Sequence, residues 1–420
     1  MTDTKTASPA SCRFCGSTDL HTFVDLGMSP LCETYLTADQ LDRMEPFYPL
    51  TVRICRACLL VQLRDYVDAQ EIFEEYAYFS SYSDSWLAHA RTYSERMIDR
   101  FGLDADSFVV ELASNDGYLL RNFVERGIPC LGIEPAANVA KVAVEAGVPT
   151  RVEFFGVDSA RRLAGEGKQA DLICGNNVLA QVPDLNDFVA GIKILLAPGG
   201  VVTIEWPHVL QLMRQNQFDT IYHEHFSYFS LLVHERIWQH HGMRVFDVEE
   251  LPSHGGSLRV FGCHADDATK EDGEGLRRMR IIEEMAGIDR FEGYGHYTEQ
   301  VEKTKHALLT FLIAARAEGK HIAGYGAPGK GNTLLNYCGI RTDLIDYLVD
   351  RNPYKHGRFA PGTHIPIFPT DQLEKTKPDI IVIMPWNLRD EIARQLAYTR
   401  AWGAQLVVAI PTLEIVEESL

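Results

Sequence analysis

The sequence predicts an α/β protein in three parts: a small N-terminal module that binds a metal, followed by two doubly wound domains. Two CxxC pairs near the N-terminus indicate the module. Two separate series of apolar strand, small-residue loop and helix start near Phe108 and His321 and indicate the two domains. A length of 420 residues agrees with two or three domains. We expect the three parts to span residues 1–75, 76–275 and 276–420.

The charge and the hydrophobic pattern exclude several classes of partner. Asp and Glu total 58 against 40 Lys and Arg, which gives a formal net charge of −18. This sign repels nucleic acid and anionic membranes, and no basic run offsets it. The sequence has no apolar run long enough to cross a bilayer, and its polar N-terminus lacks the apolar core of a signal peptide. We therefore expect a cytoplasmic enzyme that binds neither nucleic acid nor membrane.

Four of the nine cysteines form the two close pairs, Cys12 with Cys15 and Cys55 with Cys58. Four thiolates suit tetrahedral zinc and leave no position open for a substrate, so we expect a structural zinc site. A redox pair or unrelated thiols are the alternatives. The other cysteines lie mostly in apolar runs, which indicates buried thiols and not a disulfide framework.

The central domain begins with the apolar strand Phe108–Leu112, which leads into the small-residue turn Ala113–Gly117 and then a helix. A second strand, Pro129–Glu134, ends in an acid near the spacing at which a doubly wound fold places its ribose-binding carboxylate. This series alone fits either a dinucleotide or S-adenosylmethionine. The turn lacks GxGxxG, which argues against a dinucleotide.

The next strands favour S-adenosylmethionine. The apolar strand Asp171–Leu179 ends in polar residues, and an LxPGG turn at Leu196–Gly200 precedes another strand. Together these features resemble class I methyltransferases, whose central domain is Rossmann-like. The resemblance implies that Glu111 and the turn surround the methionine end of the cofactor, that Glu134 binds the ribose hydroxyls and that Asn177 lies near the sulfonium. The expected cofactor-binding residues are Glu111, Ala113, Ser114, Asn115, Gly117, Tyr118, Glu134, Pro135 and Asn177.

The densest polar cluster of the sequence is Ile221–Phe229, which reads IYHEHFSYF. Its HxH element suits a metal, but no third ligand follows nearby, and a hydrogen-bonded core cluster is a second alternative. Acid–base chemistry is the interpretation that we favour. In a regular strand, Tyr222 and Glu224 would face one side and His225 the other. A pocket that uses all three side chains therefore requires a loop or a bulge.

At this point several motifs occur in a characteristic order: CxxC…CxxC, YAYFSSYSDSW, VVELASNDGYLL, GNNVLAQVPDL, IYHEHFSYFS, HGGSLRVF and GYGAPGKGNTLLN. Together they resemble the bacterial sugar C-methyltransferases that act on dTDP-4-keto-deoxysugars in deoxysugar and antibiotic biosynthesis. The resemblance covers nearly the whole chain. It is closest to members that methylate C-3 of a dTDP-3-amino-2,3,6-trideoxy-4-keto hexose.

The resemblance implies roles for four residues. His225 is the expected base, Glu224 orients it or holds the sugar amine, and Tyr222 hydrogen-bonds the ketone oxygen. Tyr76, from an aromatic segment that is either core or a lid, contacts the sugar or the cofactor. One residue departs from the family pattern: Gln181 stands where we expect histidine. Glutamine forms hydrogen bonds but cannot shuttle protons, so either a histidine at this position is dispensable or this chain is a variant with reduced activity.

The C-terminal domain contains the glycine-rich loop Gly324–Gly331 after a predicted strand. It matches GxxxxGK, but Gly331 replaces the magnesium-binding Ser or Thr, which argues against an ATPase. It also matches GxGxxG, so an NAD-dependent oxidoreductase is the alternative function, and a non-catalytic zinc-ribbon adaptor is a third. We interpret this domain as a sugar-nucleotide site. The expected substrate-binding residues are Ser80, Gly329, Lys330, Asn332, Asp350, Arg351 and Lys355.

Overall fold

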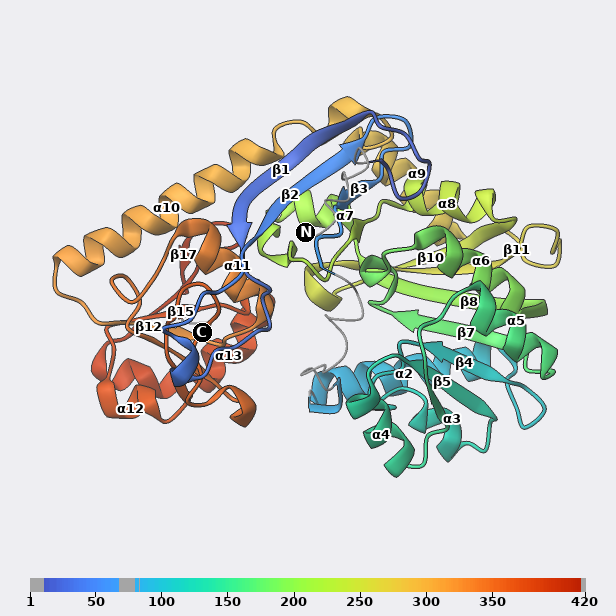
Figure 1. Cartoon of the computed structure of the whole chain (residues 1–420), viewed down its shortest axis with the longest axis horizontal. Coiled ribbons are helices and arrows are strands. Elements are labelled where there is room, and N and C mark those ends of the chain that lie inside the picture. The colour runs from blue at the N-terminus through green and yellow to red at the C-terminus, as the bar shows by residue number, and fades with distance from the viewer. Residues whose placement is uncertain (1–10, 68–79, 83, 417–420) are drawn as a thin grey trace, which may run out of the picture. The chain divides into compact units, whose positions relative to one another are not determined.

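The computed structural model describes residues 11–67, 80–82 and 84–416 (Figure 1). The chain divides into two compact units, which we call the first and the second unit. The first unit comprises residues 1–21, 54–209 and 224–293, and the second comprises 22–53, 210–223 and 294–420. Among the described residues, no helix has the length and apolar character needed to cross a membrane. The domain boundaries expected after residues 75 and 275 remain predictions.

The first unit contains a seven-stranded sheet in the order β10-β11-β8-β7-β4-β5-β6. The strands β4 to β8 are parallel, and β11 runs antiparallel to both of its neighbours. The predicted strands 108–112, 129–134 and 171–179 appear as β4, β5 and β7, and their continuous apolar character suits strands that are buried on both faces. The bounds are β4 Val109–Leu112, β5 Cys130–Glu134, β6 Thr150–Val152, β7 Ala170–Asn176, β8 Leu196–Pro207, β10 Met243–Leu251 and β11 Ser257–His264.

Helices accompany this sheet. The longest, α2, places Tyr93 and Met97 in a core that also contains Phe123 from α3 and Phe261 from β11. Asp184 precedes helix α6 and caps it, because its carboxylate accepts a hydrogen bond from the backbone amide of Asp187 in the first turn. The bounds are α2 Asp84–Phe101, α3 Arg121–Glu125, α4 Ala137–Glu145, α5 Val157–Gly165, α6 Leu185–Leu195, α8 Leu231–His240 and α9 Glu274–Ala286.

The second unit contains a six-stranded sheet in the order β14-β13-β12-β15-β16-β17, parallel except for β17. The predicted second doubly wound domain is therefore present. Its strands are β12 Ile322–Tyr325, β13 Tyr347–Asp350, β14 Ile367–Pro369, β15 Ile380–Ile383, β16 Gln405–Val408 and β17 Glu414–Ile415. Its helices are α10 Tyr297–Ala317, α11 Gly329–Cys338, α12 Gln372–Thr376 and α13 Arg389–Gln395, and α7 Val209–Arg214 lies almost entirely in this unit.

The segment between the two sheets' strands β11 and β12 forms two helices. The charged stretch 280–318 has a continuous helical pattern, but the structure divides it between α9 and α10. Gly287 ends α9 in the left-handed conformation, with φ +76°, and its amide bonds back to the carbonyl of Glu284. A glycine in this conformation terminates helices efficiently, and α10 starts only at Tyr297.

A third, four-stranded sheet has the order β1-β2-β3-β9. Its strands are β1 Leu20–Ser29, β2 Tyr48–Cys55, β3 Val61–Leu63 and β9 Ser227–Tyr228. The second cysteine pair lies at the end of β2 and in the turn that follows it, and β3 pairs antiparallel with β9. This pairing attaches the end of the motif 221–229 to the strand that follows the cysteines.

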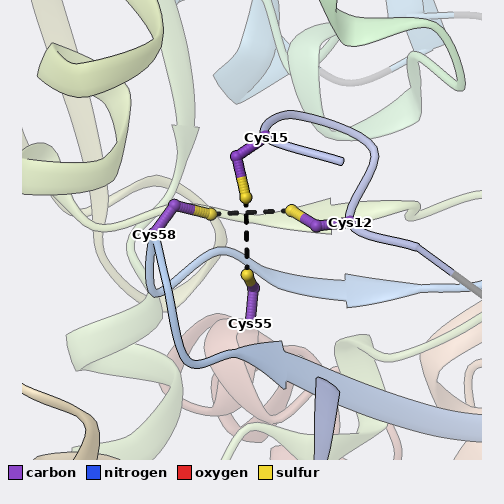
Figure 2. A group of neighbouring side chains, drawn as sticks. All are labelled: Cys12, Cys15, Cys55 and Cys58. Atoms are coloured by element: carbon purple, nitrogen blue, oxygen red, sulfur yellow. Dashed lines mark hydrogen bonds between the residues drawn. The ribbon is translucent and has the colours of Figure 1, made fainter. Parts of the chain in front are cut away.

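The four predicted zinc ligands meet at one point (Figure 2). The sulfurs of Cys12 and Cys58 are 3.5 Å apart, those of Cys15 and Cys55 are 3.6 Å apart, and all four lie within 4.8 Å of one another. Disulfide sulfurs are about 2.0 Å apart. Tetrahedral zinc with Zn–S bonds of about 2.3 Å separates its sulfurs by roughly 3.8 Å. The cluster therefore fits zinc and does not fit a disulfide.

Arg13 fastens the first cysteine pair to the rest of the first unit. Its guanidinium donates to the carbonyl of Pro183 over 2.8 Å and to the carbonyl of Leu63, and it lies 5.3 Å from the ring centroid of Phe226. The side chain of Asn186, at the start of α6, donates to the carbonyl of Arg13 over 3.2 Å. The loop that carries Cys12 and Cys15 is thus hydrogen-bonded to β3 and to the segment 183–186.

We expect removal of the metal to unfold this module first, because without zinc a segment of this size lacks a core of its own. Metal analysis of the purified protein should find about one zinc per chain. The substitution Cys58→Ser should abolish zinc binding and lower the melting temperature. Cys338→Ser, which alters a buried thiol in α11, is the control and should keep the zinc. Protein purified without chelators that contains no zinc would contradict the assignment.

Candidate active site

The order of the seven-stranded sheet reverses at β4, which lies between β5 and β7. In such sheets, ligands bind outside the carboxyl ends of the strands at the point of reversal. The strand register pairs Glu111 with Cys174 and Asn176 with Glu205. Polar side chains from β4, β7 and β8 therefore gather at the edge where a ligand is expected.

The turn after β4 has an unusual backbone. Ala113, Asn115 and Gly117 all adopt positive φ values, of +57°, +50° and +77°. The amides of this turn are bonded within the protein: Ser114 donates to the carbonyl of Ile133 over 3.2 Å, and Asn115 donates to Glu134 over 2.8 Å. A side chain at position 117 would place its Cβ 2.9 Å from a methyl group of Val148, so only glycine fits there. Ala113 adopts a conformation that costs a non-glycine residue about 1 kcal/mol.

Glu111 is the buried acid at the end of β4. Its side chain is 1% exposed, and its carboxylate has no cationic partner among the residues that the structure describes, while the neighbouring Tyr118 side chain acts to lower its pKa. Burial raises the pKa of Glu111 well above its usual range. An unpaired buried carboxylate is costly unless a cation reaches it. The amino group of a methionine-derived cofactor supplies such a cation, so the site fits the predicted group.

Glu134 ends β5 as predicted. Its two oxygens accept the amides of Ala136 and Asn115 over 2.9 Å and 2.8 Å. Its pKa is raised, because burial outweighs these two bonds. The backbone amide of Ser80 donates to the side-chain oxygen of Asn115 over 2.9 Å, and the expected role of Ser80 in substrate binding remains a prediction. The turn Ser80–Tyr82 is therefore attached to the predicted cofactor loop.

The remaining cofactor candidates surround the same turn. Ser114 is fully buried, and Tyr118 is 3% exposed directly after the turn. Pro135 is half-buried behind Glu134, and Asn177 follows the last residue of β7. The structure thus brings together the predicted cofactor residues at the ends of β4, β5 and β7, and their individual roles remain proposals.

A buried ionic cluster at the end of β8 was not predicted. The carboxylate of Glu205 is fully buried and lies 2.6 Å from a guanidinium nitrogen of Arg259 and 3.1 Å from Nε2 of His89. Burial alone would raise the pKa of Glu205, but the His89 bond and the Arg259 charge outweigh it and lower the pKa to about 2. The available sequence signal was an acid at the end of the strand that follows the LxPGG turn.

The motif 221–229 is not a regular strand. It therefore has the loop that Tyr222, Glu224 and His225 would need in order to face one pocket. A turn occupies His223 and Glu224, and strand pairing resumes only at β9. Next to His225, the amide of Phe226 donates to the carbonyl of Ala180 over 2.7 Å. This bond places His225 beside the short helix Leu179–Gln181, which follows β7. Among the described residues, the only cluster with metal-ligand geometry is the cysteine cluster, so the HxH element has no third ligand there.

The other predicted catalytic residues lie in different surroundings. Glu224 is 8% exposed and belongs to the first unit, as His225 does, whereas Tyr222 belongs to the second unit. His223 bonds to the carbonyl of Pro49 over 3.3 Å, and burial lowers its pKa. Tyr76 lies outside the described residues. The catalytic roles of these side chains remain proposals.

In the second unit, the sheet order reverses at β12, and the glycine loop follows this strand. A side chain at Gly329 would contact Cys32 and Glu33. The side-chain nitrogen Nδ2 of Asn332 donates to the backbone carbonyl of Cys32 over 2.7 Å. The amide of Ala327 donates to Asp350 over 2.7 Å. Residues 32–33 therefore pack against this loop, which the sequence pattern did not indicate.

The three cationic substrate candidates, Lys330, Arg351 and Lys355, differ in their contacts. Lys355 donates to the carbonyl of Ala327 over 2.8 Å, and Arg351 is exposed. Lys330 donates to Asn387 over 3.0 Å and lies 5.1 Å from the ring centroid of Trp386, at the carboxyl end of β15. Trp386 and Asn387, just after β15, thus contact the glycine loop.

Asp219 is a second residue that the sequence did not single out. It is fully buried in the second unit and accepts a hydrogen bond from Nε1 of Trp386 over 2.7 Å. Burial raises its pKa to about 6, and the Lys330 charge acts against this shift. No motif surrounds it in the sequence, and only the fold brings it to the glycine loop.

Comparison with solved structures finds methyltransferases at low similarity. One is the 1,6-didemethyltoxoflavin-N1-methyltransferase of Burkholderia thailandensis, at 17% identity over 49% of this chain and 95% of that chain, with a TM-score of 0.37. Another is the magnesium protoporphyrin IX methyltransferase of Synechocystis, at 12% identity over 48% and 99%, with a TM-score of 0.35. TM-scores this low carry no inference about the substrate.

Family models match three consecutive segments of the chain. A zinc binding domain matches residues 12–73, a methyltransferase domain matches residues 86–248, and a C-methyltransferase C-terminal domain matches residues 252–411. The first match contains all four cysteines of the cluster. The second contains the sheet edge that carries Glu111, Glu134 and Asn177.

One curated relative matches over nearly its full length. The C-methyltransferase NovU of Streptomyces niveus is 34% identical over 405 residues, which cover 96% of each chain. This match favours a methyltransferase over the two alternatives from the sequence, an NAD-dependent oxidoreductase and a non-catalytic adaptor. The chain therefore belongs to the family of C-methyltransferases that includes NovU, and it is an S-adenosylmethionine-dependent enzyme with an N-terminal zinc-binding domain.

Proposed function

We propose that the enzyme methylates C-3 of a dTDP-linked 4-keto-deoxysugar that carries a 3-amino group, in the biosynthesis of deoxysugar-containing antibiotics. The ordered motifs that resemble sugar C-methyltransferases support this substrate. The observation that carries the proposal is the bond between Phe226 and Ala180, because it holds His225 next to the loop that follows β7. This contact supports a base close to the edge where the methyl donor is expected.

Methyl transfer to carbon requires an activation step that transfer to oxygen or nitrogen does not need, because a carbon bound to hydrogen is a poor nucleophile. The C-4 ketone acidifies the hydrogen on C-3, and a base removes this proton to leave an enolate. When bound at this edge, S-adenosylmethionine would supply an electrophilic methyl group, with neutral S-adenosylhomocysteine as the leaving group. The electron pair of the enolate forms the new C–C bond, the electrons of the S–CH₃ bond remain on sulfur, and the ketone is regenerated.

In this proposal His225 accepts the C-3 proton and releases it to solvent. An imidazole suits this step because its pKa lies near neutral pH. Glu224 orients His225 or holds the sugar amine. Tyr222 donates to the ketone oxygen as negative charge develops there. Tyr76 contacts the sugar or the cofactor.

Cofactor binding is assigned to the edge of the first unit. Glu111 pairs with the amino group of S-adenosylmethionine, Glu134 accepts the ribose hydroxyls, and Asn177 lies near the sulfonium. The nucleotide of the substrate is assigned to Lys330, Arg351 and Lys355, whose positive charges suit a diphosphate despite the acidic composition of the chain. The direct test of the reaction is incubation with the dTDP-3-amino-4-keto sugar and analysis of the product for one added methyl group by mass spectrometry. An unmodified sugar would exclude this substrate.

The variant Glu111→Gln tests the cofactor assignment. The amide lacks the charge that pairs with the cofactor amine, so we expect affinity for S-adenosylmethionine to fall about 10-fold or more, about 1.4 kcal/mol. Titration calorimetry without sugar measures this loss. An unchanged affinity would show that a residue other than Glu111 binds the amino group of the cofactor.

In the cofactor-free protein, Glu111→Gln should make the folded state more stable at neutral pH than the wild type. Burial raises the folded pKa of Glu111 above its ordinary value of 4.5. The stability of the wild type should therefore fall as pH rises from about 4.5 through the folded pKa, because the folded state must then bury an unpaired charge. Glu111→Gln should lose less stability over this interval, as measured by urea unfolding at several pH values. A steeper loss in the variant would contradict the sign of the shift.

Replacement of His225 by Asn should lower kcat by roughly 10²- to 10⁴-fold, as expected for loss of a general base. It should also slow exchange of the C-3 hydrogen with deuterated water, which NMR of the sugar detects. His223→Asn is the matched control two residues earlier. It removes a bond to the carbonyl of Pro49 and should retain exchange. Unchanged exchange in the His225 variant would place the base elsewhere.

The variant Gln181→His restores a group that can transfer protons next to the loop of His225. We expect kcat to rise, by up to about 10²-fold, because an imidazole can relay the proton that Gln181 cannot. Steady-state kinetics with the same substrate measure this change. A decrease in kcat would show that the glutamine amide is itself required at this position.

A further inference from the structure

The loop between β10 and β11 contains His254 in a backbone conformation that is unfavourable for histidine. Its φ is +53° and its ψ is +21°, and two glycines with positive φ follow it. A residue other than glycine in this region costs about 1–3 kcal/mol and persists only when its surroundings determine it. Strain of this kind concentrates at functional sites. His254 therefore requires an explanation from its contacts.

The loop is fastened to the edge that carries the predicted cofactor site. Ser253 donates from its hydroxyl to Glu205 over 2.7 Å, and the amide of His208, just after β8, donates to the carbonyl of Gly256 over 3.1 Å. The ring of His254 meets the indole of Trp86 edge-on, with centroids 5.5 Å apart. These contacts hold the imidazole at the carboxyl ends of β7 and β8.

The imidazole contacts one residue of the predicted cofactor set. Nδ2 of Asn177 lies 2.9 Å from Nε2 of His254. An amide nitrogen can only donate, so Nε2 is the acceptor in this bond. The backbone of Asn177 is fixed as well, with φ +56° and an amide that donates to the carbonyl of Glu205 over 2.8 Å. The carboxamide is therefore held through its nitrogen.

The other end of this carboxamide has no partner. The oxygen Oδ1 of Asn177 is buried and accepts no hydrogen bond from any residue that the structure describes. A carboxamide oxygen carries partial negative charge, which attracts a sulfonium cation and has no comparable attraction for a neutral thioether. If the amide were reversed, its NH₂ group would face the cation and repel it. The orientation of the amide therefore affects which form of the cofactor binds better.

We propose that His254 is a positioning residue that holds the amide of Asn177 with its oxygen toward the methyl donor. The enzyme thereby binds S-adenosylmethionine in preference to the product S-adenosylhomocysteine, which then leaves more readily. The inference rests on the proposed place of Asn177 beside the sulfonium. It does not depend on the identity of the sugar.

The test compares the affinities of both cofactor forms, measured by titration calorimetry without sugar. In His254→Phe, the ring that contacts Trp86 remains but the acceptor nitrogen is lost. We expect the preference for S-adenosylmethionine over S-adenosylhomocysteine to fall about 10-fold. Asn177→Ala should show the same fall, and the double variant should show no further fall, because both residues act through one amide. His254→Asn, which tolerates a left-handed backbone, serves as a second variant if the phenylalanine variant does not fold.

Ser253→Ala is the matched control in the same loop. It loses the bond to Glu205 but leaves the contact with Asn177, so the preference should not change. A purely structural role of His254 predicts an equal loss for both cofactor forms, which would overturn the inference, as would additive effects in the double variant. Failure to methylate the proposed sugar would leave these binding results unaffected, so the two proposals fail separately.

Discussion

The reversal of strand order at β4 is the constraint on which the active site depends. It brings two buried acids, Glu111 and Glu205, to one edge of a parallel sheet, and their surroundings differ. Glu205 is neutralised by Arg259 and bonded to His89, so its charge is satisfied within the protein. Glu111 has no such partner among the described residues. The same edge thus contains one acid whose charge is satisfied within the protein and one that we propose is paired by a cationic ligand.

The zinc-binding module contributes to this site through its contacts. Arg13, next to the ligand Cys12, bonds to the carbonyl of Pro183 and lies over the ring of Phe226. These two residues belong to the loops that carry Gln181 and His225. The bond between Phe226 and Ala180 joins the same two loops directly. A metal that has no open position for substrate is therefore linked to the geometry of the predicted base.

Much of the architecture was predictable because it rests on local signals. CxxC spacing identified all four cysteines of the cluster, and apolar runs identified β4, β5, β7 and β12. The loop after β4 and the acid that ends β5 also follow from short-range patterns. The ion pair of Glu205 with Arg259 could not be read from the sequence, because it depends on the register between β8 and β11. The packing of Cys32 and Glu33 against the glycine loop joins segments about 300 residues apart in the chain.

The most direct measurement of the central claim is a crystal structure with S-adenosylhomocysteine and the dTDP-4-keto sugar bound together. The account predicts that the cofactor sulfur lies at the carboxyl ends of β4 and β7. It also predicts that the imidazole of residue 225 lies within about 3.5 Å of C-3 of the sugar, a separation at which a proton can be transferred. A sugar ring bound far from that imidazole, or a cofactor bound away from this edge, would contradict it.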